Sequence, residues 1–249
     1  MTRPIPPDDR LDPAMLLGAY AVGVFPMADA RDAASVYWVE PRRRAVLPLD
    51  GFHLSHSLRR TLGADRFRVT ADQAFPDIIR LCAQSATDRP DTWINGAIEQ
   101  VFLDLHAAGF AHSIECWDGD RLAGGLYGLA LGRAFFGESM VSRATDASKV
   151  ALAWLVARLG VGGFTLLDCQ FQTAHLRTLG VVEIDRADYL SALSEALAGV
   201  VGASAATAPT RAGDFFALDR APDRSGALST AVSGPVAGKD IAQLLVQTS

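Results

Sequence analysis

Three extended segments joined by short turns constrain the fold of this chain more than any other feature. Strand-forming residues dominate 112–117, 122–130 and 134–138, and Asp118-Gly119-Asp120 supplies a tight turn after the first segment. Strands separated by so few residues pair with their sequence neighbours in opposite directions. The sequence therefore predicts an antiparallel meander near the middle of the chain.

Helical patterns lie on both sides of this meander. Asp12 followed by Pro13 offers an N-cap with proline in the first turn, which predicts a buried helix over 15–22. Asn95 can cap a second helix over 95–108, where apolar residues recur at helical spacing. We expect a mixed sheet in an α+β fold, with further helices over 146–159, 174–179 and 186–197, and further strands over 37–38, 45–48, 164–168 and 181–184.

Composition limits the class of protein. The 249 residues are 49% hydrophobic and 20% charged, which suits one compact unit or two small units that share a core. The three cysteines form no CxxC pair, so a reducing compartment is expected. The apolar stretch 14–28 follows acidic residues and contains Pro26, so we interpret it as folded structure. Since no apolar run is long enough to span a membrane, we expect a cytoplasmic protein.

The chain divides into three parts by composition and pattern. We expect a small N-terminal domain over 1–62 and a larger domain over 63–200. Ala, Gly, Ser, Thr and Pro dominate 201–249, which predicts a low-complexity tail that is largely disordered or loosely attached. This holds despite Phe215-Phe216 and the apolar run 241–246.

Positive charge is concentrated near the N-terminus although the net charge is −5. Between Arg42 and Arg68 the chain has seven arginines and only two aspartates. Such a cluster can contact phosphates. It can equally form a solvated basic face or pair with carboxylates elsewhere.

Familiar cofactor signatures are missing, since the chain has no GxxxxGK[ST], GxGxxG, HExxH or GxSxG motif. Its five histidines show no convincing metal-ligand spacing. The densest polar groups are Gly137-Glu138-Ser139-Met140 and Asp168-Cys169-Gln170, each at the end of an expected strand. Buried carboxylates and amides must be paired, so these residues form either a structural hydrogen-bond network or a binding site.

At these residues the sequence resembles bacterial leucyl/phenylalanyl-tRNA–protein transferases. The match runs in order from about residue 15 to 195 and is carried by Ala19-Tyr20, Gly23-Val24-Phe25-Pro26, Trp38, Pro41, Arg44-Ala45-Val46-Leu47, Thr92-Trp93-Ile94, His112-Ser113-Ile114-Glu115, Gly124-Gly125-Leu126-Tyr127-Gly128, Gly137-Glu138-Ser139-Met140, Ser148-Lys149, Asp168-Cys169-Gln170, His175, Leu179-Gly180 and Tyr189.

The resemblance implies that the larger domain is similar to the GNAT-type acetyltransferases and uses aminoacyl-tRNA in place of acetyl-CoA. Leu or Phe, and conceivably Met, would pass to the α-amino group of proteins that begin with Arg or Lys, marking them for degradation in the N-degron pathway. An aminoacyl ester carries its own activation, so neither ATP, metal nor another cofactor is expected. We expect a monomer with no membrane partner.

The resemblance also implies residue roles. Asp168 would polarise the carboxamide of Gln170, whose oxygen would orient and help to deprotonate the attacking amine, and Glu138 would bind the acceptor's cationic side chain. The expected aminoacyl pocket consists of Leu126, Phe135, Met140, Leu155 and Leu159. The expected tRNA contacts are Trp38, Trp93, Arg42, Arg43, Arg44, Arg59 and Arg60.

Two other functions fit parts of the sequence. A CoA-dependent N-acetyltransferase of the same fold would require an Arg/Gln-x-x-Gly-x-Gly/Ala loop at the start of a helix, and we find no such loop. A non-catalytic tRNA-binding protein would not need Asp168 beside Gln170.

Overall fold

The computed structural model describes residues 10–84, 92–198, 212–220 and 236–247. Its central sheet has seven strands, which lie in the spatial order β4 (Arg68–Ala71), β5 (Ala111–Asp118), β6 (Arg121–Leu131), β7 (Ala134–Ser142), β8 (Leu166–Gln170), β3 (Arg43–Val46) and β9 (Val182–Asp185). Neighbouring strands are antiparallel except for β7 and β8, which run parallel. The predicted α+β fold with a mixed sheet is therefore confirmed.

The predicted meander forms the middle of this sheet. Strands β5 and β6 pair from Ala111↔Leu129 to Asp118↔Arg121, and β6 and β7 pair from Gly124↔Ser142 to Leu131↔Ala134. The short turns between them leave no other pairing geometry. Because the meander ends with β7, this strand is the one that pairs with β8, the next strand along the chain.

Helix boundaries follow the capping signals that the sequence carries. Asp12 caps α1 (Pro13–Ala21) by accepting a hydrogen bond from the backbone N–H of Ala14 at 2.8 Å. Asn95 caps α4 (Gly96–Ala107) in the same way, through the N–H of Ile98 at 3.0 Å. Both predicted helices form, but α1 is not the buried helix that was expected, since only Leu16 and Tyr20 are buried and Met15 is 45% exposed.

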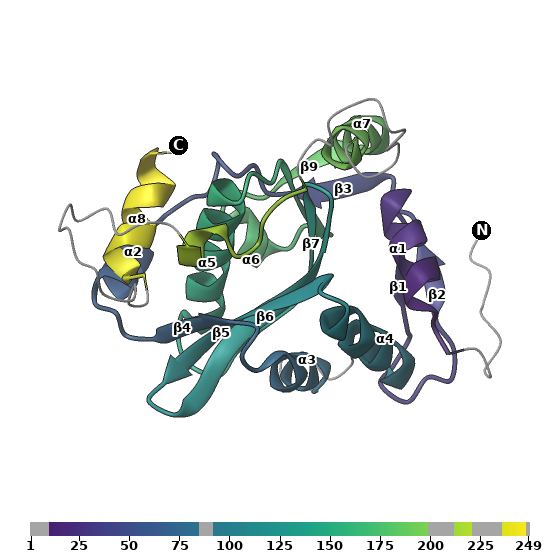
Figure 1. Ribbon diagram of the computed structural model, residues 1–249, viewed down its shortest axis with the longest axis horizontal. Coiled ribbons are helices and arrows are strands. Elements are labelled where there is room, and N and C mark those ends of the chain that lie inside the picture. The colour runs from purple at the N-terminus through teal and green to yellow at the C-terminus, as the bar shows by residue number, and fades with distance from the viewer. Residues whose placement is uncertain (1–9, 85–91, 199–211, 221–235, 248–249) are drawn as a thin grey trace.

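Two apolar clusters fill the space on the two faces of the sheet (Figure 1). On one face, α5 (Ala147–Val161) packs against β5 and β6, and α2 (His56–Gly63) and α8 (Gly238–Gln247) pack beside it. On the other face lie α3 (Phe75–Ala83) and α4. This second cluster also includes buried residues of α1 and of α7 (Arg186–Leu197).

The remaining elements are short. Strands β1 (Phe25–Met27) and β2 (Tyr37–Val39) form a separate two-stranded sheet near α1, and α6 (Ala174–Arg177) follows β8. Six elements of the described chain were not predicted, namely α2, β4, α3, β1, α8 and the short 3-10 helix η1 (Ala217–Arg220). The first three lie in the arginine-rich segment and just after it. Two of them carry helix signals that were missed, because Ser55 caps α2 and Phe75, Ile78, Ile79 and Cys82 recur at helical spacing along α3.

The C-terminal segment differs from the expectation of a loosely attached tail. Phe215, Leu218, Ile241 and Leu245 are at most 4% exposed and belong to the cluster around α5. Phe215 leads into the short 3-10 helix η1 (Ala217–Arg220), which contains Leu218. Ile241 and Leu245 lie on α8. Their apolar burial outweighs the low-complexity composition around them. The rest of the expected tail, 201–211, 221–235 and 248–249, lies outside the described residues.

Candidate functional site

The parallel pairing of β7 and β8 ends abruptly in the middle of the sheet. It runs from Ala134↔Leu166 to Phe136↔Asp168, although β7 continues to Ser142 and β8 continues to Gln170. Beyond Asp168 the side chains, rather than the backbone, connect the two strands. The two polar motifs of the sequence meet at this point.

Glu138 is the extra residue of a β-bulge in β7. On β6 the consecutive residues Tyr127 and Gly128 oppose Ser139 and Gly137, so Glu138 has no partner in the register. Bulges re-aim side chains and are frequent beside active sites. Here the bulge leaves the Glu138 side chain 8% exposed and directed at α1 and β8.

The Glu138 carboxylate accepts two hydrogen bonds. The hydroxyl of Tyr20 on α1 donates to Oε1 at 2.8 Å, and Nε2 of Gln170 donates to Oε2 at 2.9 Å. Burial raises the pKa of Glu138 to about 8, although both hydrogen bonds oppose that rise. A carboxyl group with such a pKa exchanges its proton near neutral pH, which is characteristic of functional sites.

Asp168 is fully buried beside Glu138 and is held by three residues from distant parts of the chain. Arg44 donates to it from Nε at 2.9 and 3.0 Å and from Nη2 at 2.6 Å. The Tyr189 hydroxyl donates at 2.8 Å, and the backbone N–H of Gln170 donates at 2.7 Å. These donors satisfy a carboxylate that would otherwise be costly to bury.

The Arg44 side chain is as buried as its partner. It is 2% exposed, and its guanidinium carbon lies 4.5 Å from the ring centre of Phe25 and 4.7 Å from that of Tyr189. Burial opposes the charge, but the Asp168 carboxylate outweighs it and raises the pKa of Arg44. The guanidinium therefore stays charged, and its ion pair with Asp168 fixes β3 against β8.

Gln170 adopts a strained backbone conformation next to this pair. Its φ of +61° lies in the left-handed region, which non-glycine residues rarely occupy. A second bulge lies here, because Ala45 and Val46 oppose Gln170 and Asp168 and leave Cys169 unmatched. The strain places the carboxamide against Glu138 while its own N–H bonds Asp168.

The structure therefore brings Asp168, Gln170 and Glu138 together, as the sequence motifs suggest. The contact of Asp168 differs from the expected one, since it bonds the backbone N–H of Gln170 and the carboxamide bonds Glu138. Sequence reasoning gave no role in this network to Tyr20 and Tyr189, whose phenol pKa values burial raises well above normal. Burial and Asp168 likewise raise the pKa of Cys169, which disfavours a thiolate there.

The five expected pocket residues lie in one apolar cluster on the α5 face. Leu126, Phe135, Leu155 and Leu159 are at most 3% exposed, and Met140 packs against them half-buried. Met140 pairs with Leu126 across β6 and β7, two residues beyond Glu138. The cluster therefore adjoins the polar centre.

The expected tRNA contacts lie on several different elements. Trp38 on β2 and Trp93 are both partly buried in the cluster that contains α1. Arg42 and Arg43 are exposed at the start of β3, where Arg43 pairs with Asp185 at 3.0 Å. Figure 1 places α2, which carries the exposed Arg59 and Arg60, beside α8 and away from β3. Arg44 corrects the expectation, because its guanidinium is buried on Asp168 and unavailable to a phosphate.

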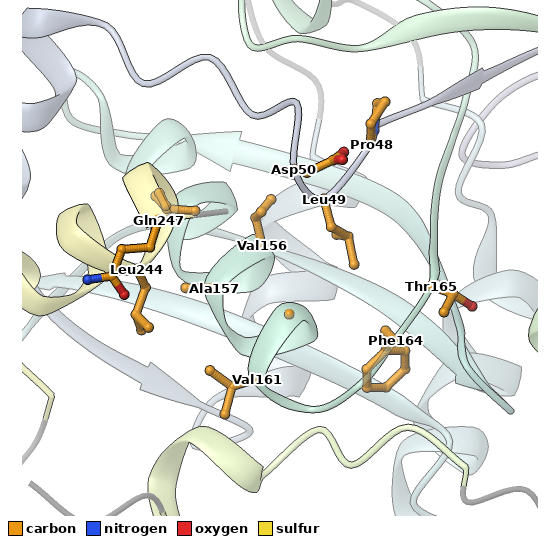
Figure 2. A pocket seen from close by; sticks show the side chains of 12 residues that line it. Pro48, Leu49, Asp50, Val156, Ala157, Val161, Phe164, Thr165, Leu244 and Gln247 are labelled. Atoms are coloured by element: carbon orange, nitrogen blue, oxygen red, sulfur yellow. The ribbon is translucent and has the colours of Figure 1, made fainter. Parts of the chain in front are cut away.

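An open cavity of about 760 Å³ lies elsewhere, between the segment after β3, the outer side of α5 and α8 (Figure 2). Its lining is mainly apolar and consists of Pro48, Leu49, Asp50, Val156, Ala157, Gly160, Val161, Phe164, Thr165, Leu244, Leu245 and Gln247. None of these residues belongs to the Asp168 network. The cavity therefore does not bear on the chemistry of that centre.

The described residues hold neither a cluster of metal ligands nor a candidate membrane-spanning helix. No group of three or more His, Cys, Asp or Glu side chains is arranged to hold a metal ion among them. None of the helices within the described ranges combines the length and apolarity that crossing a bilayer requires.

Fold and site together define an α+β protein with a buried acid–amide centre where two parallel strands part. Family models for the leucyl/phenylalanyl-tRNA protein transferase and for its N-terminal domain match residues 46–194 and 9–42. The chain belongs to this family, as the sequence resemblance predicts.

Three relatives carry the name leucyl/phenylalanyl-tRNA–protein transferase. The protein of Rhizorhabdus wittichii is 57% identical over 250 residues, which cover 96% of this chain and 99% of the relative. That of Phenylobacterium zucineum is 51% identical over 240 residues with the same coverage of each. That of Zymomonas mobilis is 59% identical over 189 residues, covering 76% of this chain and 70% of the relative.

Proposed function

We propose that this protein transfers Leu or Phe from aminoacyl-tRNA to the α-amino group of proteins that begin with Arg or Lys. The observation that carries the proposal is the buried centre of Asp168, Gln170 and Glu138 in a chain that the family models match over residues 9–42 and 46–194. Acceptor proteins marked in this way would enter a degradation pathway in the cytoplasm.

The reaction requires a free amine and a stabilised oxyanion. An α-amine with a pKa of about 8 is mostly protonated at neutral pH, so it must lose a proton before attack. Its nitrogen then bonds the ester carbonyl carbon, the bond to the ribose oxygen breaks, and that oxygen takes up a proton. Holding both substrates in line supplies much of the acceleration.

Gln170 is suited to orient the amine. Its Nε2 donates to Glu138, which leaves the carboxamide oxygen at the opposite end as an acceptor for an amine N–H. Asp168 acts through the backbone, because it holds the Gln170 N–H and so maintains the unusual φ. In this assignment Gln170 contacts the substrate and Asp168 is a positioning residue.

Glu138 is suited to recognise the acceptor's positive side chain. A cation placed near a carboxyl group with a pKa of about 8 favours its ionised form, so acceptor binding would release a proton from Glu138. A neutral first residue would leave the ionised Glu138 carboxylate buried without a positive partner. This difference accounts for selection of Arg or Lys.

The donor side chain would occupy the cluster of Leu126, Phe135, Met140, Leu155 and Leu159. Met140 is half-buried beside the polar centre, and a flexible thioether adapts to Leu, Phe or Met. The terminal adenosine would stack on Trp38 or Trp93, and the exposed Arg42, Arg43, Arg59 and Arg60 would contact the acceptor stem.

The wider architecture completes the proposal. The parallel strands β7 and β8 part at Phe136 and Asp168 and open a site in the middle of the mixed sheet. We assign this larger unit to the GNAT-like acetyltransferase folds and keep the boundaries near residues 62 and 200. We also propose that the protein is a monomer. It needs no cofactor, because the donor ester is already activated.

A transfer assay tests this function. The protein is incubated with tRNA charged with labelled Leu and with peptides that differ only in beginning with Arg or Ala. We expect label on the Arg peptide, little on the Ala peptide, and a loss of about 100-fold or more for Gln170→Leu, which removes the acceptor oxygen at similar size. Circular dichroism and tRNA binding check that this variant is folded. Absence of transfer with both Leu- and Phe-tRNA would refute the proposal.

A further inference from the structure

Residues 212–220 form a strap that joins two turns at one end of the molecule. The N–H of Gly213 donates to the carbonyl of Gly132 in the β6–β7 turn at 2.8 Å, and the N–H of Asp214 donates to Gly162 at the end of α5 at 2.9 Å. A Cβ atom on Gly162 would lie only 2.3 Å from the Asp214 carbonyl oxygen. The strap lies outside both segments that the family models match.

A buried arginine fixes this strap to α5. Arg158 is 3% exposed and donates to both carboxylate oxygens of Asp219, at 2.6 and 2.8 Å, and to the Phe215 carbonyl at 2.9 Å. A buried guanidinium is costly to leave unpaired, and a bidentate carboxylate sets its orientation. The last turns of α5 are thus tied to the strap.

The ring of Phe215 supports the ring of Phe135. Phe215 is 4% exposed, its centroid lies 5.8 Å from that of Phe135, and the two planes differ by 12°. Gly128 lies against another part of the Phe135 ring, because a Cβ there would come within 2.4 Å of it. Phe215 also lies against the ring of His112, 4.1 Å away and nearly parallel, against the ring of Phe216 at 5.3 Å and against the Arg158 guanidinium at 5.1 Å. The position of Phe135 therefore depends on the strap.

We propose that the strap sets the shape of the aminoacyl pocket and that Phe215 is a positioning residue for donor selection. The inference rests on the proposed function and on three of its five pocket residues. Phe135 is stacked on Phe215, while Leu155 and Leu159 lie within one turn of the clamped Arg158. Leu and Phe differ in shape more than in chemistry, so a small displacement of the pocket wall changes their relative transfer rates.

The experiment compares kcat/KM for Leu-tRNA and Phe-tRNA with one Arg-initiated peptide. We expect Phe215→Leu to change the Leu-to-Phe ratio by about five-fold or more, mainly through the donor KM, with the acceptor KM unchanged. Asp219→Asn should change the ratio in the same direction, and Asp219→Glu, which keeps the charge, should restore part of it. Asp219 is 46% exposed at its side chain, so these variants keep the core intact.

A matched control separates positioning from general destabilisation. Phe75 is fully buried and stacks on a histidine, His106, at 4.2 Å, but it lies in the cluster on the other face of the sheet. Phe75→Leu should lower the melting temperature without changing the donor ratio. An unchanged ratio in both Phe215→Leu and Asp219→Asn, or an equal change in Phe75→Leu, would overturn the inference. Loss of transfer from both donors in the wild type would instead refute the proposed function.

Discussion

At the residue scale, the site depends on contacts between residues that are far apart in the sequence. Asp168 is bonded by Arg44, Tyr189 and the N–H of Gln170, and Glu138 is bonded by Tyr20 and Gln170. Each donor lets a carboxyl group be buried, yet the two acids have different kinds of partner. Asp168 accepts hydrogen bonds from the charged guanidinium of Arg44. Glu138 accepts them from the neutral side chains of Tyr20 and Gln170, and burial raises its pKa to about 8.

The raised pKa of Glu138 makes stability depend on pH. Between its usual value of 4.5 and about 8, the folded chain holds a proton that the unfolded chain has released. Stability therefore falls as the pH rises through this window, by at most about 1.4 kcal/mol per pH unit. We expect the wild type to lose stability relative to Glu138→Gln between pH 5 and 8 in urea titrations. Parallel curves for the two proteins would contradict the assigned shift.

The sequence predicts the identity of these acids better than their contacts. The motifs predict Glu138, Asp168 and Gln170 at strand ends, but only Gln170 ends its strand, because β7 continues past Glu138 to Ser142. The proximity of the three side chains follows from the fold. The partner of Asp168 could not be inferred, because Arg44 lies in a run of three arginines whose members look alike in sequence. Only the fold separates them, because Arg43 is exposed at the start of β3 whereas Arg44, Ala45 and Val46 are all buried.

At the element scale, irregularities in the strands create the site. One bulge places Glu138 between the register positions of β7, and another leaves Cys169 unmatched on β8. A regular pleat would point alternate side chains to fixed faces and would not bring Glu138 and Gln170 together. Neither bulge has a sequence signature that we could identify, whereas the strands that contain them do.

The bulge in β7 needs a glycine on the adjacent strand. Gly128 opposes Gly137, yet a Cβ on Gly128 would lie 2.3 Å from the Phe136 carbonyl oxygen, while a Cβ on Gly137 would meet nothing closer than 3.4 Å. We expect Gly128→Ala to lower the unfolding free energy by about 1–3 kcal/mol and to reduce transfer, because the added methyl group forces the backbone at Phe136 to move. Gly137→Ala is the control and should stay near the wild type in chemical denaturation. Equal losses would show that crowding is not the cause.

At the scale of the whole molecule, the described C-terminal segments 212–220 and 236–247 pack against the core around α5. The two family models meet between residues 42 and 46, where β3 enters the large sheet. The sequence predicts the helices and strands from 95 to 197 well, because caps, glycines and short turns bound each of them. It fails beyond residue 200, where short apolar runs within low-complexity sequence give no indication of what they pack against.

The last helix offers the clearest test of this return. Ile241 on α8 is fully buried against the cluster around α5, whereas Val246 on the same helix is 46% exposed. We expect Ile241→Ala to lower the unfolding free energy by about 2–5 kcal/mol and Val246→Ala to change it by less than about 0.5 kcal/mol. Both values come from urea denaturation of the full chain. A loosely attached tail would make the two substitutions equally silent, so a small effect of Ile241→Ala would mean that α8 contributes no packing energy. A large effect would show that the segment after residue 235 stabilises the same core that supports β7, β8 and the acid–amide centre.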